Sequence, residues 1–497
     1  MEQIEGTLKT LGPSTTTLQA ISVTTYTYIE IGDRVLKKIR VFQGMTGPLQ
    51  QGLNTPQPVT HPLTPFAENG FPFGNSEGQF NYTVDPHFRT PYSYVYSLGV
   101  QRELPGHFIL DVEYVGRLGR KLFAQADAAQ VVNFKDPTSG HFLLPDFTAL
   151  TKELRAGVST VTPQPWFENQ MGTALASGGL SCADFGEPSC TQIIADFFGN
   201  LAIKGDVSDT LQALQSFTQF SPTGFLPNNS GLPGQFSSNT YITNLGSSSY
   251  NAMLVTLRKN YSHGLQFDFN YTLSHSIDNV SSIANTVVGG LVCDAANLRV
   301  CRGNSDFDVT HLFSANGVYD LPFGRGKGLG RSVPGWANQI IGGWQLGSIF
   351  TAHSGFAFST NSGAFPIGFI FDSPGVLTGS ASALSTNIHT DSSGRIQLFA
   401  DTTAAKAALS NPLPGEIGNR NNLRGPGFVN FDTSLSKRFF MPWSEKHTLQ
   451  FRAEAYNLFN HTNFADPGAN INSSTFGRIT AQANSNRVMQ FALRYDF

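Results

Sequence analysis

The most constraining feature of the sequence is a strict alternation of apolar and polar residues that recurs along most of the chain. In LQFDFNYTLS, residues 265–274, every second residue is apolar and those between are polar. Successive side chains of a strand point to opposite faces, so the apolar set lines one face and the polar set, including Asp268, lines the other. The pattern therefore predicts a β-strand with one apolar face.

Similar alternation predicts further strands elsewhere. They are expected at residues 93–101, 108–114, 251–259, 309–321, 340–354, 429–439, 447–459, 475–482 and 487–497. With weaker candidates such as 21–31, the total is about ten to twelve strands, many of them longer than the usual five or six residues. At about 3.3 Å per residue, such strands are long enough to cross a bilayer when tilted.

The segments between the strands differ greatly in length. Residues 104–106 form a short turn, whereas residues 127–245, 278–306 and 360–424 are long and polar. Loops of that length are uncommon in compact soluble domains, and short turns opposite long loops are typical of outer-membrane barrels. Within the first long loop, residues 208–217 have apolar residues at helical spacing and predict a short helix, with Ser208 or Asp209 as its N-cap.

Composition supports a membrane barrel. Charged residues make up 13% of the chain, which contains 41 Phe and has a net charge of −3; typical soluble proteins have about 25% charged residues. The negative net charge argues against a nucleic-acid partner, since proteins that bind nucleic acids are normally basic. No apolar run is long enough for a transmembrane helix, and the N-terminus lacks the features of a signal peptide. The expectation is that the chain is either cytosolic or does not begin where the natural protein begins.

The cysteines form two local pairs of equal spacing. Cys182 and Cys190 enclose ADFGEPS, and Cys293 and Cys301 enclose DAANLRV, both in polar stretches. The spacing favours two loop disulfides and hence an oxidising compartment. Free thiols are the alternative. A zinc site is disfavoured because neither pair is CxxC and no His lies beside either.

A glycine-rich stretch, PFGRGKGLGRS, follows the alternating residues 309–321. A phosphate-binding loop requires GxxxxGK[ST], but Lys327 is followed by Gly328. The GxGxxG form also fails, because position 329 is Leu. The stretch is therefore predicted to be the end of a strand and a turn, and no nucleotide cofactor is expected.

Two groups of residues allow a catalytic or metal-binding alternative: Ser274, His275, Ser276 and Asp278, and then Asp306, Asp308 and His311. In the predicted strand, His275 falls on the apolar face opposite Ser274, and Asp278 is expected in the following loop. No GxSxG elbow or HExxH helix supports either alternative. We therefore expect no enzyme, no catalytic residues, no metal site and no cofactor.

The last strand indicates which face meets lipid. Phe491, Leu493, Tyr495 and Phe497 alternate with polar or small residues. On the closing strand of a barrel, one face meets lipid and the other the lumen, with Tyr495 and Phe497 in the aromatic girdle. The predicted lipid-facing set is Leu265, Phe267, Phe269, Phe451, Phe491 and Leu493, and the predicted lumen-facing set is Gln266, Asp268, Arg452, Glu454 and Arg494.

Several passages resemble TonB-dependent outer-membrane receptors of the Oar-like group, which carry a carboxypeptidase-regulatory-like domain at the front. The matching passages are TPYSYVYSLGVQRELPGHFILDVEYVGRLGRKL, NYTLSHSIDN, SDFDVTHLFSANGVYDLPFGRGKG, GPGFVNFDTSLSKRF, RAEAYNLFNHTNF and the terminal RVMQFALRYDF. They are scattered over most of residues 90–497. The resemblance implies a signal peptide, a regulatory-like β-sandwich, a plug, a TonB-contacting segment and a barrel of roughly 22 strands.

From this resemblance, the expected fold is all-β: a partial antiparallel transmembrane β-barrel of about ten to twelve strands with long extracellular loops. Residues 1–89 are assigned to an N-terminal barrel segment and loop of a truncated barrel, and residues 90–497 to the C-terminal half of the receptor barrel. The expected location is the cell outer membrane. The chain is expected to be a fragment without plug or signal peptide.

The resemblance also implies function and partners. A complete receptor would bind and import an unidentified small-molecule, glycan or peptide ligand. The expected partners are outer-membrane lipid, the barrel assembly machinery, which would read Phe497 and its strand, and a TonB-type energy-coupling protein acting through the missing N-terminal part. The alternatives are an outer-membrane adhesion or structural barrel without transport and a soluble secreted β-protein.

Overall fold

A computed structural model describes residues 81–497, except residues 86, 128–129, 132, 219–238, 282–289, 369–370 and 442. The candidate strand at residues 21–31 and nearly all of the expected segment 1–89 lie outside this range. No helix in the described part of the chain is long and apolar enough to cross a membrane.

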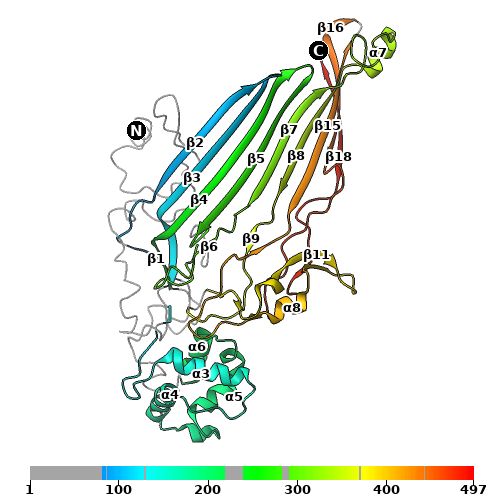
Figure 1. Cartoon of the computed structure of the whole chain (residues 1–497). Helices are drawn as coiled ribbons and strands as arrows, with labels where there is room; N and C mark the ends of the chain where they lie inside the picture. The colour runs from blue at the N-terminus through cyan, green and yellow to red at the C-terminus, as the bar shows by residue number, and fades with distance from the viewer. Residues whose placement is uncertain are drawn as a thin grey trace, which may run out of the picture.

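The dominant element is an antiparallel meander, which contains nine long strands among the described residues (Figure 1). Its strands are β2 (Tyr92–Leu104), β3 (Phe108–Asp127), β4 (Asn239–Ser262), β5 (Leu265–Asp278), β7 (His311–Asp320), β8 (Trp344–His353), β15 (Phe428–Met441), β16 (Ser444–Tyr456) and β18 (Val488–Asp496). Each pairs with the next in chain order. Short β1 (Asn81–Val84) adds parallel to β4, and short β6 (Gly303–Asn304) adds to β5.

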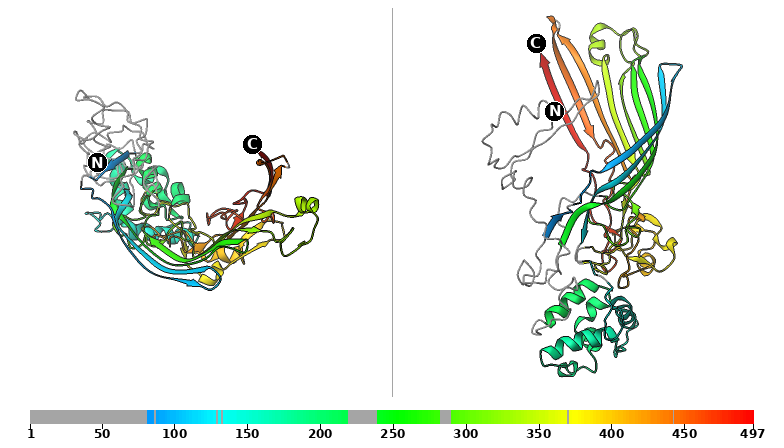
Figure 2. Two further views of the ribbon diagram at one scale, coloured as in Figure 1. Left: turned by 90° about the horizontal axis from the view of Figure 1, so that it is seen from above. Right: turned by 90° about the vertical axis from the view of Figure 1, so that its left-hand side faces the viewer.

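The meander is an open, curved sheet (Figure 2). In the described part of the chain, β2 and β18 form its two edges, so these residues do not by themselves close a barrel. Short turns and the C-terminus lie at one end, which we call the short-turn end, and the long connections lie at the other, the loop end (Figure 1). Because the strands alternate in direction, β2 and β18 both run from the loop end to the short-turn end.

The strand register confirms that the predicted apolar residues share one face. Phe269 pairs with Leu257 on one side and Ala315 on the other, and Phe451 pairs with Leu493. The opposite face carries polar pairs such as Arg258 and Asp268, whose Nε and Oδ1 are 2.6 Å apart. Phe491 and Leu493 are 65% and 67% exposed. A continuous exposed apolar face of this kind requires an apolar environment.

Two lysines on the apolar face depart from the alternation. Lys259 and Lys437 lie near the short-turn end, where their Nζ atoms donate to Gly106 O at 2.9 Å and Ile340 O at 3.0 Å. Each ammonium also lies near aromatic rings, such as that of Phe108. The lysines thus place apolar stems on the sheet while their charges reach turn carbonyls, as long cationic side chains do at interfaces.

Three predictions about the strands were wrong in detail. Residues 340–341 belong to helix α7 (Gly335–Ile341), which follows Pro334, and β8 starts only at Trp344. Residues 475–482 contribute only β17 (Arg478–Ile479), because the apolar side chains there pack into a loop core. Asp278 ends β5 and does not lie in the following loop, because β6 extends the pairing at that point.

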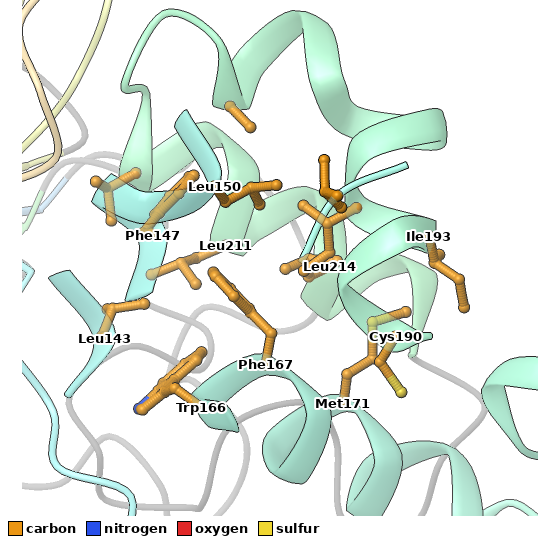
Figure 3. Packing of buried hydrophobic residues seen from close by; sticks show 14 of the residues in the cluster. Leu143, Phe147, Leu150, Trp166, Phe167, Met171, Cys190, Ile193, Leu211 and Leu214 are labelled. Carbon is orange, nitrogen blue, oxygen red and sulfur yellow. The ribbon is translucent and has the colours of Figure 1, made fainter. Parts of the chain in front are cut away.

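A helical unit fills much of the first long loop (Figure 3). Its elements are α3 (Leu143–Arg155), α4 (Pro165–Ser177), η2 (Cys182–Phe185), α5 (Cys190–Ala202) and α6 (Val207–Phe217). Phe147, Trp166 and Phe167 are fully buried at its centre. The sequence analysis predicted only one of these helices, and its N-cap is Asp206 rather than Ser208 or Asp209, since the Asp206 carboxylate accepts from Asp209 N.

The third long loop forms a second cluster at the loop end. It comprises β9 (Ala357–Phe358), β10 (Val376–Leu377), η3 (Ala381–Leu384), β11 (Thr386–Thr390), β12 (Ile396–Phe399), α8 (Thr402–Ala407), β13 (Leu409–Ser410) and β14 (Leu423–Arg424). Its core includes Phe399, which stacks on Phe476 of the last loop with ring centroids 5.3 Å apart. The loops therefore have packed cores of their own.

Arginine substitution at two neighbouring positions tests the facing of β5. Phe269→Arg should destabilise membrane-inserted protein by about 2–4 kcal/mol, because it places a charge on the lipid side, whereas Asn270→Arg should be far milder. The comparison is made on the complete receptor, by denaturant unfolding in a bilayer. Equal losses at both positions would contradict the assignment of faces.

The stability of the helical unit should depend on pH through Asp206. Burial, together with the negative charge of Asp209, raises the pKa of Asp206 from its usual 3.8 to about 7. Between these values the folded state holds a proton that the unfolded state releases, so stability falls as pH rises. From pH 5 to pH 8 the unfolding free energy should fall by about 2–3 kcal/mol.

Asp206→Asn keeps an N-cap acceptor and should remove most of this pH slope, as measured by the fluorescence of buried Trp166 during denaturant unfolding. The remainder belongs to Asp209, because burial raises the pKa of this carboxyl as well. Asp401→Asn makes the same replacement at the N-cap of α8, outside the unit, and should leave the slope unchanged. An undiminished slope in Asp206→Asn would show that another group causes it.

Candidate functional site: a pocket at the base of the loops

Three loops meet where the strands β5, β7 and β8 reach the loop end. A segment from the third loop, residues 419–426, crosses this junction and brings Arg420 and Arg424 to carboxylates of the second loop region. A Cβ on Gly355 would overlap the carbonyl oxygen of Gly425, so glycine is needed where these two backbones approach each other.

The first ion pair joins Arg420 to Asp278 at the end of β5. The carboxylate is only 2% exposed, and Arg420 Nη2 also donates to Asn304 O at 3.0 Å and Ser281 Oγ at 3.1 Å. A buried carboxylate is tolerated only when it is paired and hydrogen-bonded. The pair therefore fastens the third loop to the end of the sheet.

The second ion pair joins Arg424 to Asp308, which is also almost fully buried. Asp308 Oδ1 accepts from Ser276 N at 2.5 Å, and Arg424 Nη1 donates to Asp308 O at 2.6 Å. His275 Nδ1 lies 3.5 Å from the same carboxylate. Asp308 thus connects the end of β5, the start of β7 and the crossing segment.

Asn421 lies between the two arginines and is buried. Its φ of 52° is in the left-handed region, which Asn tolerates better than most residues. Its Nδ2 donates to Asn304 O at 2.7 Å and to Asp306 Oδ1 at 2.6 Å. Ser359 Oγ donates to Asn421 Oδ1 at 2.9 Å. These bonds fix the position of Asp306, which is exposed.

Beside this network lies a pocket of about 640 Å³. Its lining residues combine aromatic rings, carboxylates and small polar groups: Ser281, Asp306, Phe307, Phe356, Ala357, Phe358, Ser359, Asn421 and Asp466. Phe307 and Phe356 are 59% and 43% exposed although they lie in well-packed loops. Apolar walls with a few fixed polar groups are typical of ligand sites.

The pocket is electrostatically negative. Asp306 and Asp466 line it, and none of its lining residues is Lys, Arg or His. Partial burial raises the pKa of Asp466, and in the described part of the chain no basic side chain lies within ion-pair distance of it. The arrangement suits a ligand that offers hydrogen-bond donors or positive charge together with an apolar surface.

The residues considered for catalysis are engaged in hydrogen bonds within the sheet and at its loop end. Ser274 Oγ donates to Val309 O at 2.7 Å, Ser276 Oγ lies 2.8 Å from Ser305 Oγ, and His311 Nδ1 lies 2.8 Å from Tyr271 Oη. Among the residues described, no group of three or more His, Cys, Asp or Glu side chains could hold a metal ion. Asp306 accepts a hydrogen bond from Asn421, and Asp308 is paired with Arg424.

The structure joins both cysteine pairs named from the sequence. Cys182 is bonded to Cys190, with Cα atoms 5.2 Å apart, and Cys293 to Cys301, at 5.4 Å. Cys190 belongs to the core of the helical unit. Cys293 and Cys301 pack against Ala124 and Ala126 near the end of β3. Each pair thus lies in a loop that packs at the loop end.

The fold defines the class of protein: an antiparallel sheet with membrane-length strands, one apolar face, short turns at one end and folded loops at the other. The model of the outer membrane β-barrel domain family matches residues 37–490, and the chain belongs to that family. It is therefore an outer-membrane protein. Membership in a barrel family also points to a non-enzymatic role.

Among solved structures, the outer membrane transporter YddB from Escherichia coli matches with a TM-score of 0.36 and 9% identity. The match covers 84% of this chain and 34% of that chain, so the chain spans about a third of the length of that transporter. Comparison with curated proteins finds no match.

The sequence analysis missed four residues that line the pocket, Asn421, Phe307, Phe356 and Asp466, and also Arg420 of the ion-pair network beside it. One signal was available. Arg420 and Arg424 form a small basic group directly before the predicted strand 429–439. Asp306 and Asp308 form a small acidic group directly before the predicted strand 309–321. Strands that are neighbours in a sheet bring such flanking residues together, but β7 and β15 are not neighbours, because β8 lies between them in the sheet.

Removing one partner of a buried pair tests the role of the crossing segment. Arg424→Met leaves the Asp308 carboxylate uncompensated and should destabilise the loop junction by about 3–5 kcal/mol. The expected sign is faster proteolysis by proteinase K within residues 411–426. Adding Asp308→Asn should restore part of the protection.

Arg395→Met is the matched control, because Arg395 pairs with Asp391 on the surface. Exposed pairs contribute about 0–1 kcal/mol, so this variant should leave the proteolysis of residues 411–426 unchanged. If Arg424→Met behaved like this control, the pair would not hold the junction.

The two disulfides predict a specific peptide map. Non-reducing digestion of protein recovered from an outer membrane should yield Cys182 linked to Cys190 and Cys293 linked to Cys301, because each pair lies within bonding range. Free thiols, or a link between the two loops, would contradict the pairing and the oxidising location of the loops.

Proposed function

We propose that this chain supplies part of the barrel of a TonB-dependent outer-membrane receptor, which binds a ligand at its loops and imports it. Membership in the outer membrane β-barrel domain family and the passages that resemble Oar-like receptors support the proposal. Energy coupling would act through parts of the receptor outside residues 90–497.

The observation that carries the proposal is the direction of the two edge strands. As described, the meander has an odd number of strands, so β2 and β18 run in the same direction. They could pair with each other only in parallel. The same holds if two copies formed one barrel, because β18 of one copy would again lie parallel to β2 of the other. Closure by antiparallel pairing therefore needs an odd number of further strands, as in the even-numbered barrels of bacterial outer membranes.

The need for further strands follows from the membrane itself. Each edge presents a row of unpaired N–H and C=O groups, and each such group costs several kcal/mol in hydrocarbon. The chain also enters β2 from the loop end. An odd number of preceding strands would place the start of the barrel at the short-turn end, beside the C-terminus, as expected for a receptor whose plug and coupling segment lie in the periplasm.

The pocket at the base of the loops is the proposed site of ligand capture. It combines exposed Phe307 and Phe356 with Asp306 and Asp466. Buried ion pairs hold the pocket in place, so its shape exists before a ligand arrives. A preformed pocket reduces the entropy lost on binding.

The proposal is tested by comparing the chain behind an added signal peptide with the same chain joined to its upstream reading frame. Alone, it should give no heat-modifiable band and no uptake, because the described edge strands β2 and β18 cannot pair with each other antiparallel. With an odd number of preceding strands it should insert, and uptake should require TonB. Stable insertion with energy-dependent uptake by residues 1–497 alone would overturn the proposal of a partial barrel. Surface attachment that is unaffected by loss of TonB, without uptake, would favour an adhesion barrel.

Phe497 is proposed to direct assembly together with Phe491, Leu493 and Tyr495. Its side chain is 91% exposed at the end of β18, and the rings of Tyr495 and Phe497 stack with centroids 6.2 Å apart. Deleting Phe497 from the complete receptor should reduce the amount of heat-modifiable protein in the outer membrane, whereas Phe497→Tyr, which keeps the aromatic ring, should be milder. Unchanged insertion after the deletion would refute this role.

A further inference from the structure

The turn between β7 and β8, residues 321–343, lies at the short-turn end beside the C-terminus (Figure 1). It carries Arg325, Lys327 and Arg331, all exposed. Residues 321–350 contain no Asp or Glu. This is the glycine-rich stretch that cannot bind a nucleotide as a phosphate loop, so its basic charge needs another explanation.

The same turn exposes large apolar side chains. Trp336 is 72% exposed, Ile340 61% and Leu329 57%. Trp443 in the neighbouring β15–β16 turn is 68% exposed. Trp and aliphatic residues beside basic ones are typical of the boundary between hydrocarbon and headgroups.

The turn is held in one conformation by the sheet. Ile340 O accepts from both Trp344 Nε1, at 2.9 Å, and Lys437 Nζ, at 3.0 Å. Asn338 Oδ1 accepts from Arg325 N at 2.7 Å, and Gly324 N donates to Leu329 O at 2.8 Å. The apolar and basic side chains are therefore displayed by an ordered structure.

The basic residues of the turn form no ion pair among the described residues, although the charge of Lys327 acts on the nearby carboxylate of Asp320. Asp320, the acidic residue that directly precedes the turn, accepts from Tyr261 Oη at 2.5 Å and from Gln345 Nε2 at 2.9 Å. In the described part of the chain, no ion pair includes Arg325, Lys327 or Arg331. Their charge is available for a negatively charged partner.

We propose that this turn binds the anionic phospholipid headgroups of the membrane leaflet at the short-turn end, and that it thereby fixes the depth of β7 and β8. Trp336 and Ile340 enter the boundary layer while Arg325, Lys327 and Arg331 meet lipid phosphates. The surface is continuous with the lipid-facing side of the sheet, and its charge complements an anionic surface. This role is separate from ligand capture, which belongs to the opposite end.

Brominated lipids, which quench nearby tryptophan, test the proposal in nonionic-detergent micelles. The full chain is titrated with brominated phosphatidylglycerol or with brominated phosphatidylcholine. The quenching of Trp336 is the difference in fluorescence quenching between the native chain and the Trp336→Phe variant. Quenching of Trp336 should reach half-saturation at a lower concentration of phosphatidylglycerol than of phosphatidylcholine.

Neutralising the turn with Arg325→Gln, Lys327→Gln and Arg331→Gln together should raise the phosphatidylglycerol concentration for half-saturation at least about tenfold, since each basic residue at an anionic surface contributes roughly fivefold. The control neutralises three exposed basic residues of the loops, with Lys152→Gln, Arg299→Gln and Arg302→Gln, and should change nothing. Far-UV circular dichroism checks that every variant keeps its sheet.

Three results would overturn the proposal: equal quenching by the two lipids, a preference for phosphatidylglycerol that survives neutralisation of the turn, or no quenching that depends on Trp336. Equal quenching by the two lipids would mean that the turn contacts lipid without recognising its charge. The absence of quenching at Trp336 would mean that this side chain faces protein or solvent instead of lipid. None of these readouts involves ligand uptake, so the result stands apart from the proposed transport function.

Discussion

The structure depends on one requirement: in a membrane, every backbone N–H and C=O group must find a partner within the protein. The meander meets it along every internal strand, from β3 to β16, because each of these strands has a neighbour on both sides. The alternation in the sequence follows from the same arrangement. Once the backbone is paired, each strand has one face left for lipid and one for water.

Charged side chains avoid the lipid-facing side of the strands and lie on the polar face or at the ends of the sheet. Strand charges such as Arg258 and Asp268 pair with each other on the polar face. The charges of the junction, Arg420 with Asp278 and Arg424 with Asp308, hold the loops to the sheet in buried pairs. At the other end, Lys259 and Lys437 reach turn carbonyls, and the basic side chains of the turn 321–343 form no ion pair among the described residues. Sheet ends, rather than sheet centres, carry the specific interactions.

The parts of the fold that depend on local pattern could be predicted from the sequence, and those that depend on distant contacts could not. The face of Phe269 follows from its immediate neighbours, since a period of two is a local signal. The pairs of Arg420 with Asp278 and Arg424 with Asp308 join residues 142 and 116 positions apart. The helical unit had a local signal, because Leu143, Phe147 and Leu150 are spaced as on one helix face, but only residues 208–217 of this loop were predicted to be helical. Residues 475–482 show the opposite error, in which alternation arose from packing within a loop core.

The direction of the edge strands also restricts how a barrel of this kind can change over evolution. Adding or deleting a single strand would reverse the direction of every strand beyond it, and would move loops to the side of the turns. A hairpin such as β2–β3, with its tight turn, adds two strands and leaves all other directions intact. Size variation among relatives should therefore come in steps of two, and hairpins rather than strands are the units that can be duplicated, lost or transplanted between such proteins.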